Sequence, residues 1–206
     1  SGGSFNQFKT QLLPRFEESF LSSFGQNFIL LPTSASQKYE YNSEIKDCVM
    51  VYKKPLDEKT KAKVRKLLQE VIDSGLYEIP PNPKGEIVED RDTQITFSAL
   101  GQKAGVEEKK SWDPDQRKRK KIKEILLPQL PEVNILINAY SSIDILPQGF
   151  HKGVGLKLLL DKLNLQKSDM VYIGDGLFPG GNDYAVYESG IETIAVKGPE
   201  EVYGMI

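Results

Sequence analysis

Residues 171–183 read VYIGDGLFPGGND, a short apolar run that ends in a glycine and Asp175, followed by a loop that closes with Asp183. Three glycines and a proline lie between the two aspartates, whereas an ordinary turn needs one or two such residues. Glycine lets the backbone pass close to a ligand because it has no Cβ. The loop therefore predicts a ligand site at the end of a strand, although a plain turn followed by a helix cap uses the same residue types.

The chain around this loop alternates between helices and apolar strands. A helix is expected at Lys152–Leu163, a strand over 169–175, a short helix over 182–190 and a second buried strand over 192–198. Such alternation is typical of a doubly wound parallel sheet, in which ligands lie at the carboxyl ends of the strands. Asp175, Asn182 and Asp183 would then meet at one edge of the sheet and offer the oxygen ligands that suit Mg²⁺.

Between residues 28 and 147 the pattern changes. Helices are expected from Asp57 to Ser74 and within residues 113–130, and the remainder reads mainly as short strands. The strands are expected within residues 27–34, 37–42, 48–54, 85–91, 93–100, 132–140 and 142–147. This order suggests an open antiparallel sheet covered by helices on one face. We therefore expect an α/β core made of residues 1–27 and 148–206, with residues 28–147 inserted as an α+β module.

The composition of the 206 residues is that of an ordinary globular protein, with 39% hydrophobic and 27% charged residues. A net charge of −2 shows no bias toward nucleic acid, and the basic run at 116–123 reads as a solvated face. No apolar run approaches the roughly 18 residues of a membrane-spanning helix. A single cysteine, Cys48, allows no internal disulfide and favours the cytoplasm.

Histidine and cysteine occur once each, which argues against a zinc site and against Ser-His or Cys-His catalysis. Lysine is a better candidate: Lys152 begins a helix, where the helix dipole disfavours a cation unless an anion lies nearby. At the other end of the chain, the SGGS stretch of residues 1–4 offers hydroxyls and backbone N–H groups as a phosphate cradle. A surface lysine and a capped turn are the alternatives for these two stretches.

Taken together, SGG, HKGVGLKLLL and VYIGDGLFPGGND resemble the second, third and fourth motifs of the haloacid dehalogenase (HAD) superfamily of phosphohydrolases, in order and in spacing. The PGGND ending and the stretch SSIDILPQGFHKG are similar to those of phosphomannomutases. The insert resembles the cap of subfamily IIB, which holds sugar-phosphate phosphatases and phosphomannomutases. The resemblance implies a HAD-like Rossmannoid core with a parallel sheet and an inserted α+β cap domain.

The resemblance also implies roles for single residues. Asp175 would ligate Mg²⁺, with Asp183 and Asn182 assisting through the ion or its water shell. Lys152 would offset negative charge on the transferring phosphoryl group, and Ser1 would donate a hydrogen bond to a phosphoryl oxygen. The remaining positions that would hold the phosphorylated substrate are Gly2, Ser4, Arg91, Ser142 and Asp144.

The sequence departs from the family in two places. The first motif, an Asp-x-Asp that supplies the nucleophile and the general acid/base, occurs nowhere, because Asp113 and Asp115 have the spacing but read as a helix cap. We expect that roughly 40 residues of a βαβ unit precede this chain in the natural protein, so that the chain alone would be inactive. Of the cap arginines that hold the distal phosphate in phosphomannomutases, Arg91 fits one, whereas Gln102 stands at another and VEEKKS lacks a third.

We therefore expect an enzyme, a Mg²⁺-dependent phosphoric monoester hydrolase that acts on a sugar phosphate or a similar small phosphomonoester through an aspartyl-phosphate. The weakened site for a second phosphate favours a phosphatase over the alternative, a phosphomannomutase. A non-catalytic HAD remnant that binds a phosphorylated ligand is a further alternative. The expected partner is the small substrate, and a homodimer would be unsurprising in this family, whereas nucleic acid and membranes are not expected.

Overall fold

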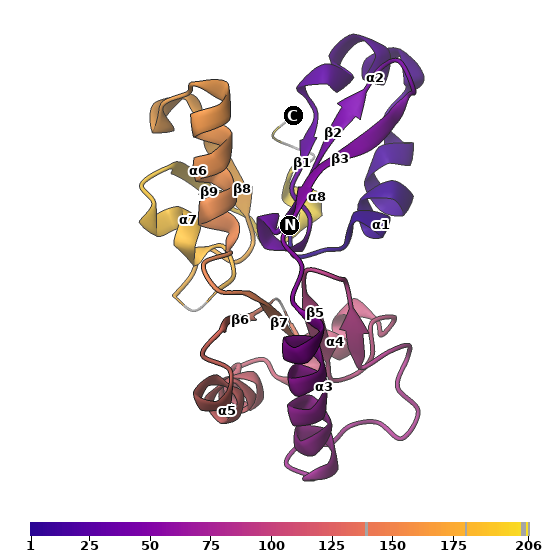
Figure 1. Ribbon diagram of the computed structural model, residues 1–206, viewed down its shortest axis with the longest axis vertical. Helices are drawn as coiled ribbons and strands as arrows, with labels where there is room; N and C mark the ends of the chain where they lie inside the picture. Colours follow the sequence, from indigo (N-terminus) through magenta and orange to yellow (C-terminus); the bar gives the residue numbers. More distant parts are fainter. Residues whose placement is uncertain (139, 180, 203–204, 206) are drawn as a thin grey trace.

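The computed structural model describes residues 1–138, 140–179, 181–202 and 205. Gly180 of the glycine-rich loop, and Ala139 of the strand predicted over 132–140, lie outside the described residues. The described strands form three separate sheets, each in its own lobe (Figure 1). Within the described part of the chain, no helix combines the length and apolar character needed to cross a membrane.

The N-terminal lobe holds an antiparallel sheet in the order β1-β2-β3. Its strands are β1 (Ile29–Leu30), β2 (Gln37–Asn42) and β3 (Asp47–Lys53). Helical segments precede them: α1 (Phe5–Gln7), which continues as helical turns to Arg15, and α2 (Glu18–Phe24). Phenylalanine and leucine side chains of these segments pack against Tyr39 and Tyr41, and Phe5 stacks on Tyr39 with 3.6 Å between ring centroids.

The second lobe, at the bottom of Figure 1, is a four-stranded antiparallel sheet in the order β4-β5-β7-β6 with helices packed against it. The strands are β4 (Val88–Asp90), β5 (Ile95–Ser98), β6 (Val133–Ile137) and β7 (Ser142–Pro147). The helices are α3 (Glu58–Asp73), α4 (Val106–Trp112) and α5 (Arg117–Leu126). Along β7, Ile143 and Ile145 enter the apolar cluster under the helices, which leaves Asp144 on the opposite face.

The C-terminal lobe joins two parallel strands, β8 (Val171–Gly174) and β9 (Glu192–Ala195). Its helices are α6 (Lys152–Leu163) and α7 (Tyr184–Glu188), and a short helix, α8 (Pro199–Val202), follows β9 in the sequence. The parallel pairing agrees with the prediction, and α6 has the predicted bounds. The prediction that both strands are buried is wrong, since Val171 is 51% and Ile173 37% exposed. Val171 and Ile173 share one face of β8, whereas Met170 and Tyr172 on the other face pack against the apolar cluster that contains Leu160 and Val186 of the helices.

The expectation of one open antiparallel sheet across residues 28–147 is also wrong, because β1–β3 pair only with one another. Their buried side chains find partners on the N-terminal helical segments and not on α3 or α5. The division of the chain into residues 1–27, 28–147 and 148–206 stays a prediction. The strand pairing favours counting β1–β3 with the N-terminal part, and we use "cap" below for the lobe built on β4–β7.

Candidate active site

The loop after β8 folds back on itself, so that Asp183 lies against the end of the strand. Gly176 donates its N–H to Asp183 Oδ2 at 3.0 Å, and the N–H of Asp183 returns to the carbonyl of Gly176 at 3.2 Å. A Cβ on Gly174 would lie 2.6 Å from Asp183 Oδ2, which leaves no room for a side chain. The described glycines therefore let the loop approach itself closely. Gly176 and Gly181 also line the cavity described below, so the prediction that this loop binds a ligand stays a prediction. The Asp183 side chain does not cap α7, which removes the helix-cap alternative.

Lys152, at the start of α6, forms a buried ion pair with Asp183 of the loop after β8. Lys152 Nζ lies 2.5 Å from Asp183 Oδ1, and the Tyr172 hydroxyl donates to the same oxygen at 2.5 Å. The Asp183 residue is only 1% exposed. Burial raises the pKa of this carboxyl, but the charge and hydrogen bond of Lys152, with the Tyr172 and Gly176 donors, outweigh it and lower the pKa overall. Asp183 is therefore a buried carboxylate that stays ionised beside a lysine cation.

Glycines also set the position of Lys152. A Cβ on Gly153 would lie 2.9 Å from the carbonyl oxygen of Ala185, so this glycine lets the first turn of α6 pack closely on α7. Gly155 meets the side chain of Ala35 in the N-terminal lobe in the same way. The pattern KGVG therefore presses the start of α6 against two other elements, which directs Lys152 toward the loop after β8.

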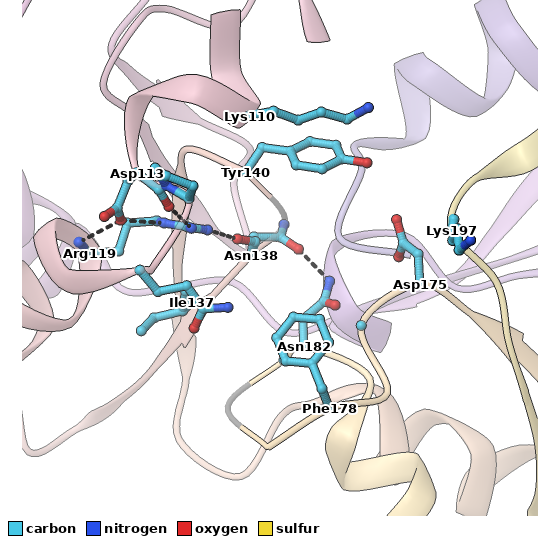
Figure 2. A pocket seen from close by; sticks show the side chains of 14 residues that line it. Lys110, Asp113, Arg119, Ile137, Asn138, Tyr140, Asp175, Phe178, Asn182 and Lys197 are labelled. Carbon is cyan, nitrogen blue, oxygen red and sulfur yellow. Dashed lines mark hydrogen bonds and ion pairs between the residues drawn. The ribbon is translucent and has the colours of Figure 1, made fainter. Parts of the chain in front are cut away.

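Asp175 lies at a cavity of about 350 Å³ between the loop after β8 and the cap (Figure 2). Asp175 is exposed, and none of the described residues donates a hydrogen bond to its carboxylate. Other residues that line the cavity are Lys110, Asp113, Arg119, Asn138, Tyr140, Phe178, Asn182 and Lys197. An unengaged carboxylate at the mouth of a polar cavity is the kind of group that binds a hard cation.

The residues predicted to hold Mg²⁺ fit it unequally. Asp175 offers a carboxylate that the described residues leave without a hydrogen bond. Asp183 accepts hydrogen bonds from Lys152, Tyr172 and Gly176, so direct ligation would compete with its lysine. Across the described residues, no three acidic, histidine or cysteine side chains gather around one point. Mg²⁺ is commonly held by one or two carboxylates together with water and substrate phosphate, and this site fits that pattern through Asp175.

Asp144 is the second buried carboxylate near the site. Thr96 Oγ1 donates to Asp144 Oδ1 at 2.8 Å, and Asn138 Nδ2 donates to Asp144 Oδ2 at 2.6 Å. Burial is the largest influence and raises the pKa of Asp144 to about 6, although the charges of Arg91 and Lys152 act against it. The Asp144 carboxyl therefore titrates close to neutral pH, well above its ordinary range.

Asp144 should make the stability of the protein depend on pH. Its pKa is about 6 in the folded protein against an ordinary 3.8, so the folded state binds the extra proton between these values. Stability should therefore fall as pH rises from about 4 to about 6, by about 3 kcal/mol from this group. The variant Asp144→Asn lacks this slope. Urea unfolding of both proteins at pH 4 and pH 7 should show the difference, and parallel pH dependences would contradict it.

The N-terminal turn meets the cap at the same place. Arg91 Nη1 donates to the carbonyl of Gly2 at 2.9 Å, and Gln94 Nε2 donates to it at 3.1 Å. Two backbone N–H groups predicted to bind phosphate are engaged: that of Gly3 with Ser1 Oγ, and that of Ser4 with the side chain of Gln7. The turn is therefore tied to the cap, and part of the predicted cradle is used inside the turn itself.

The structure brings some predicted residues together and separates others from the cavity. Lys152 meets Asp183, and Asn182 connects to Asp144 through Asn138. The Arg91 side chain, only 7% exposed, pairs with Glu89 at 2.6 Å and does not line the cavity. Ser142 likewise does not line it, and its carbonyl accepts the N–H of Asn138 at 2.9 Å. Asp113 caps α5 through the N–H groups of Lys118 and Arg119, as predicted.

Sequence reasoning missed two functional candidates, Asn138 and Tyr172. Tyr172 is a polar-tipped residue in the otherwise apolar run VYIG, which was the available signal. Asn138 follows an apolar strand without any motif around it, so only the structure reveals its partners.

Removing the Tyr172 hydroxyl should weaken the hold on Asp183. A hydrogen bond to a charged group contributes about 2 kcal/mol, so we expect Tyr172→Phe to lower the free energy of unfolding by about that amount. The matched control is Tyr187→Phe, because Tyr187 is 56% exposed. Denaturant unfolding at neutral pH measures both variants, and equal stabilities would show that the Tyr172 hydroxyl does not support Asp183.

Comparison with curated proteins places these observations in a family. The chain is 29% identical over 131 residues to a phosphomannomutase of Dendrobium officinale, covering 59% of this chain and 50% of the relative. It is 28% identical over 152 residues to a phosphomannomutase of Solanum lycopersicum, covering 70% of this chain and 56% of the relative. The chain therefore spans about half the length of the curated relatives it matches.

Solved structures share the fold. An IMP-bound, N-terminally truncated IMP-nucleotidase of Plasmodium falciparum has a TM-score of 0.62 at 18% identity, over 98% of this chain and 56% of that one. A sucrose-phosphatase from Synechocystis, in complex with sucrose and phosphate, has a TM-score of 0.51 at 17% identity, over 98% of this chain and 70% of that one. The predicted fold, a HAD-like α/β core with a cap domain, is confirmed.

The family model described as eukaryotic phosphomannomutase matches residues 5–205. That match runs through the cap sheet, Lys152 and the loop from Asp175 to Asp183. The chain therefore belongs to the eukaryotic phosphomannomutase family.

Proposed function

We propose that the complete protein is a Mg²⁺-dependent phosphatase that acts on a sugar phosphate or a similar small phosphomonoester. The observation that carries this proposal is the exposed carboxylate of Asp175 at a cavity of about 350 Å³, on the same loop whose Asp183 forms a buried ion pair with Lys152. Neither Lys152 nor Asp183 itself lines that cavity. The family match and the fold support a phosphoryl-transfer enzyme. Because the chain spans about half the length of its curated relatives, the activity is proposed for the whole protein.

The residues of this chain would act mainly through charge and position. Lys152, held by Asp183, would place a cation against the oxygens of the phosphoryl group, where preorganised charge stabilises the transition state. Asp175 would hold Mg²⁺ directly, and Asp183 would act on it only through water. When bound, the ion neutralises charge on the phosphoryl oxygens. The aspartate that would accept the phosphoryl group does not occur in these 206 residues as an Asp-x-Asp pattern after an apolar strand.

The cavity supports a small substrate. Its volume is at the lower end of the range for small-molecule sites. Tyr140 and Phe178 line it together with the amide of Asn182, which combines apolar faces and a polar group suited to a sugar (Figure 2). One structural relative, a sucrose-phosphatase in complex with sucrose and phosphate, supports the same substrate class. As part of this proposal, the single cysteine supports a cytoplasmic location.

Phosphomannomutase activity is the second candidate, because the family match favours it. A mutase must hold a second phosphate, and the cap residues at that position are already engaged. Arg91 pairs with Glu89 and contacts Gln102 Oε1 at 3.3 Å, and Lys109 Nζ donates to the Gln102 carbonyl at 2.8 Å. These contacts support hydrolysis of a monophosphate over transfer through a bisphosphate.

The two activities are separated by their products. The complete protein is incubated with Mg²⁺ and a panel of hexose monophosphates, with and without a catalytic amount of hexose bisphosphate. The proposal expects free phosphate without any bisphosphate. Isomerised hexose phosphate that appears only with bisphosphate would establish a mutase instead. Neither product across the panel would contradict both activities and support a non-catalytic ligand-binding protein.

A further inference from the structure

A line of side-chain hydrogen bonds crosses from the cap sheet to the loop after β8. Asn182 of that loop donates its Nδ2 to Oδ1 of Asn138, at the end of β6. Asn138 donates its own Nδ2 to Asp144 Oδ2 at 2.6 Å, and Thr96 donates to the other oxygen of Asp144 at 2.8 Å. The cap and the loop are therefore joined through one asparagine side chain, which Figure 2 shows pointing toward Asn182.

Asn138 is also fixed through its backbone. Its N–H donates to the carbonyl of Ser142 at 2.9 Å, and its carbonyl accepts a hydrogen bond from Arg119 Nη1. Arg119 is itself held by Asp113, with Nε 2.8 Å from Oδ2, and both side chains are buried. Asn138 is thus rigidly part of the cap, whereas Asn182 precedes Asp183 in the loop that carries the ion pair.

The chemistry of these groups fixes which way the amides point. An ionised carboxylate only accepts hydrogen bonds, so Asp144 requires the NH₂ group of Asn138. The oxygen of Asn138 must then face the loop, where it requires the NH₂ group of Asn182. The orientation of Asn182 is therefore dictated by Asp144, two hydrogen bonds away.

We propose that Asn138 is a positioning residue that latches the loop of residues 174–183 to the cap. Asn138 and Asn182 both line the cavity, so the latch holds the loop in the conformation that sets Asp183 on Lys152 while the cap lies against it. As a contribution to catalysis this inference rests on the proposed function, but the latch itself is a property of the fold. Its test therefore begins with a readout that needs no substrate.

Backbone hydrogen exchange in residues 174–183 reports the latch directly. The N–H groups of Gly176 and Asp183 are bonded only within this loop, so their exchange slows when the loop is held. We expect Asn138→Ala to raise exchange in this segment at least about tenfold, with exchange in α3 unchanged as a sign of intact folding. The matched control is Asn134→Ala, which removes an amide from the same strand that donates to the Phe150 carbonyl, away from the loop.

Swapping the side chains at positions 138 and 144 gives a sharper test. In Asn138→Asp two ionised carboxylates face each other, so this single variant should open the latch. In Asp144→Asn the amide oxygen can still accept the hydrogen bond from Asn138, so this variant should leave the latch closed. The double variant Asn138→Asp/Asp144→Asn restores a donor at 144 and an acceptor at 138 for Asn182. We expect hydrogen exchange in residues 174–183 to rise in Asn138→Asp, to stay near the wild-type rate in Asp144→Asn, and to return to within about threefold of the wild type in the double variant.

The outcomes of these experiments distinguish a failure of the latch from a failure of the proposed function. Unchanged exchange in Asn138→Ala, or a double variant that exchanges as fast as Asn138→Asp, would overturn the latch whatever the activity. In the active protein, we expect Asn138→Ala to lower kcat about tenfold and to change KM less, because the loop is mispositioned more often while the cavity remains. Faster exchange in a protein that releases no phosphate would keep the latch and remove the proposed function.

Discussion

Replacing Lys152 by alanine is expected to lower kcat/KM of the complete protein at least about a thousandfold, since it removes the preorganised cation beside the phosphoryl group. Lys152 Nζ lies 2.5 Å from Oδ1 of Asp183, and the Asp183 residue is only 1% exposed. Without the lysine this carboxylate would be a buried and uncompensated charge. Breaking such a pair costs about 3–5 kcal/mol, so the variant should also be less stable in denaturant unfolding.

The double variant Lys152→Ala/Asp183→Asn separates the two effects. Because it removes both charges, it should recover most of the lost stability while remaining inactive. Lys157→Ala is the matched control, since Lys157 is an exposed lysine on the same helix. A Lys152→Ala protein that keeps full activity, or a double variant that regains turnover, would show that the lysine does not act on the phosphoryl group.

Replacing Asp175 by asparagine is expected to abolish Mg²⁺-dependent turnover, by at least about a hundredfold, and to leave the fold intact. Asp175 is exposed, and the described residues make no hydrogen bond to its carboxylate, so little stability should be lost. Asp183→Asn, in contrast, should clearly lower the free energy of unfolding, because it leaves the nearly buried cation of Lys152 without its partner. Isothermal titration with Mg²⁺ and denaturant unfolding distinguish the two variants.

The control for this prediction is Asp161→Asn, an exposed carboxylate on α6 that lies outside the cavity. It should bind Mg²⁺ and turn over as the wild type does. If Asp175→Asn binds Mg²⁺ with unchanged affinity, the assignment of Asp175 as the direct ligand is wrong. The exposed position of Asp175 makes this a clean test, since misfolding is not a competing explanation.

Local sequence patterns predicted the elements that depend on near neighbours. The apolar residues of α3 recur at helical spacing, and the Asp57 carboxylate caps its first turn by accepting the Thr60 N–H at 2.9 Å. Helix α6 has the predicted bounds because a glycine-rich first turn and an asparagine in the left-handed region mark its ends. Helix α4 was not predicted, since VEEKKSW offers too little apolar periodicity.

Tertiary pairing was harder to foresee. Nothing in QKYEYN or DCVMVYK indicates that β2 and β3 pair apart from β5 and β7, because strand alternation specifies a face and not a partner. At the site, the spacing of Asp175 and Asp183 predicted that both lie on one loop. The different tasks of these carboxylates follow from Lys152 and Tyr172, which meet only one of them in space.

The most direct test is phosphate release by the complete protein from its preferred hexose monophosphate, in wild type and in Asp175→Asn, each with saturating Mg²⁺ and with a chelator. We predict release only by the wild type with Mg²⁺, and background rates in the other three reactions. Equal release by wild type and variant, with or without the metal, would contradict the central claim that Asp175 and Mg²⁺ form the catalytic centre.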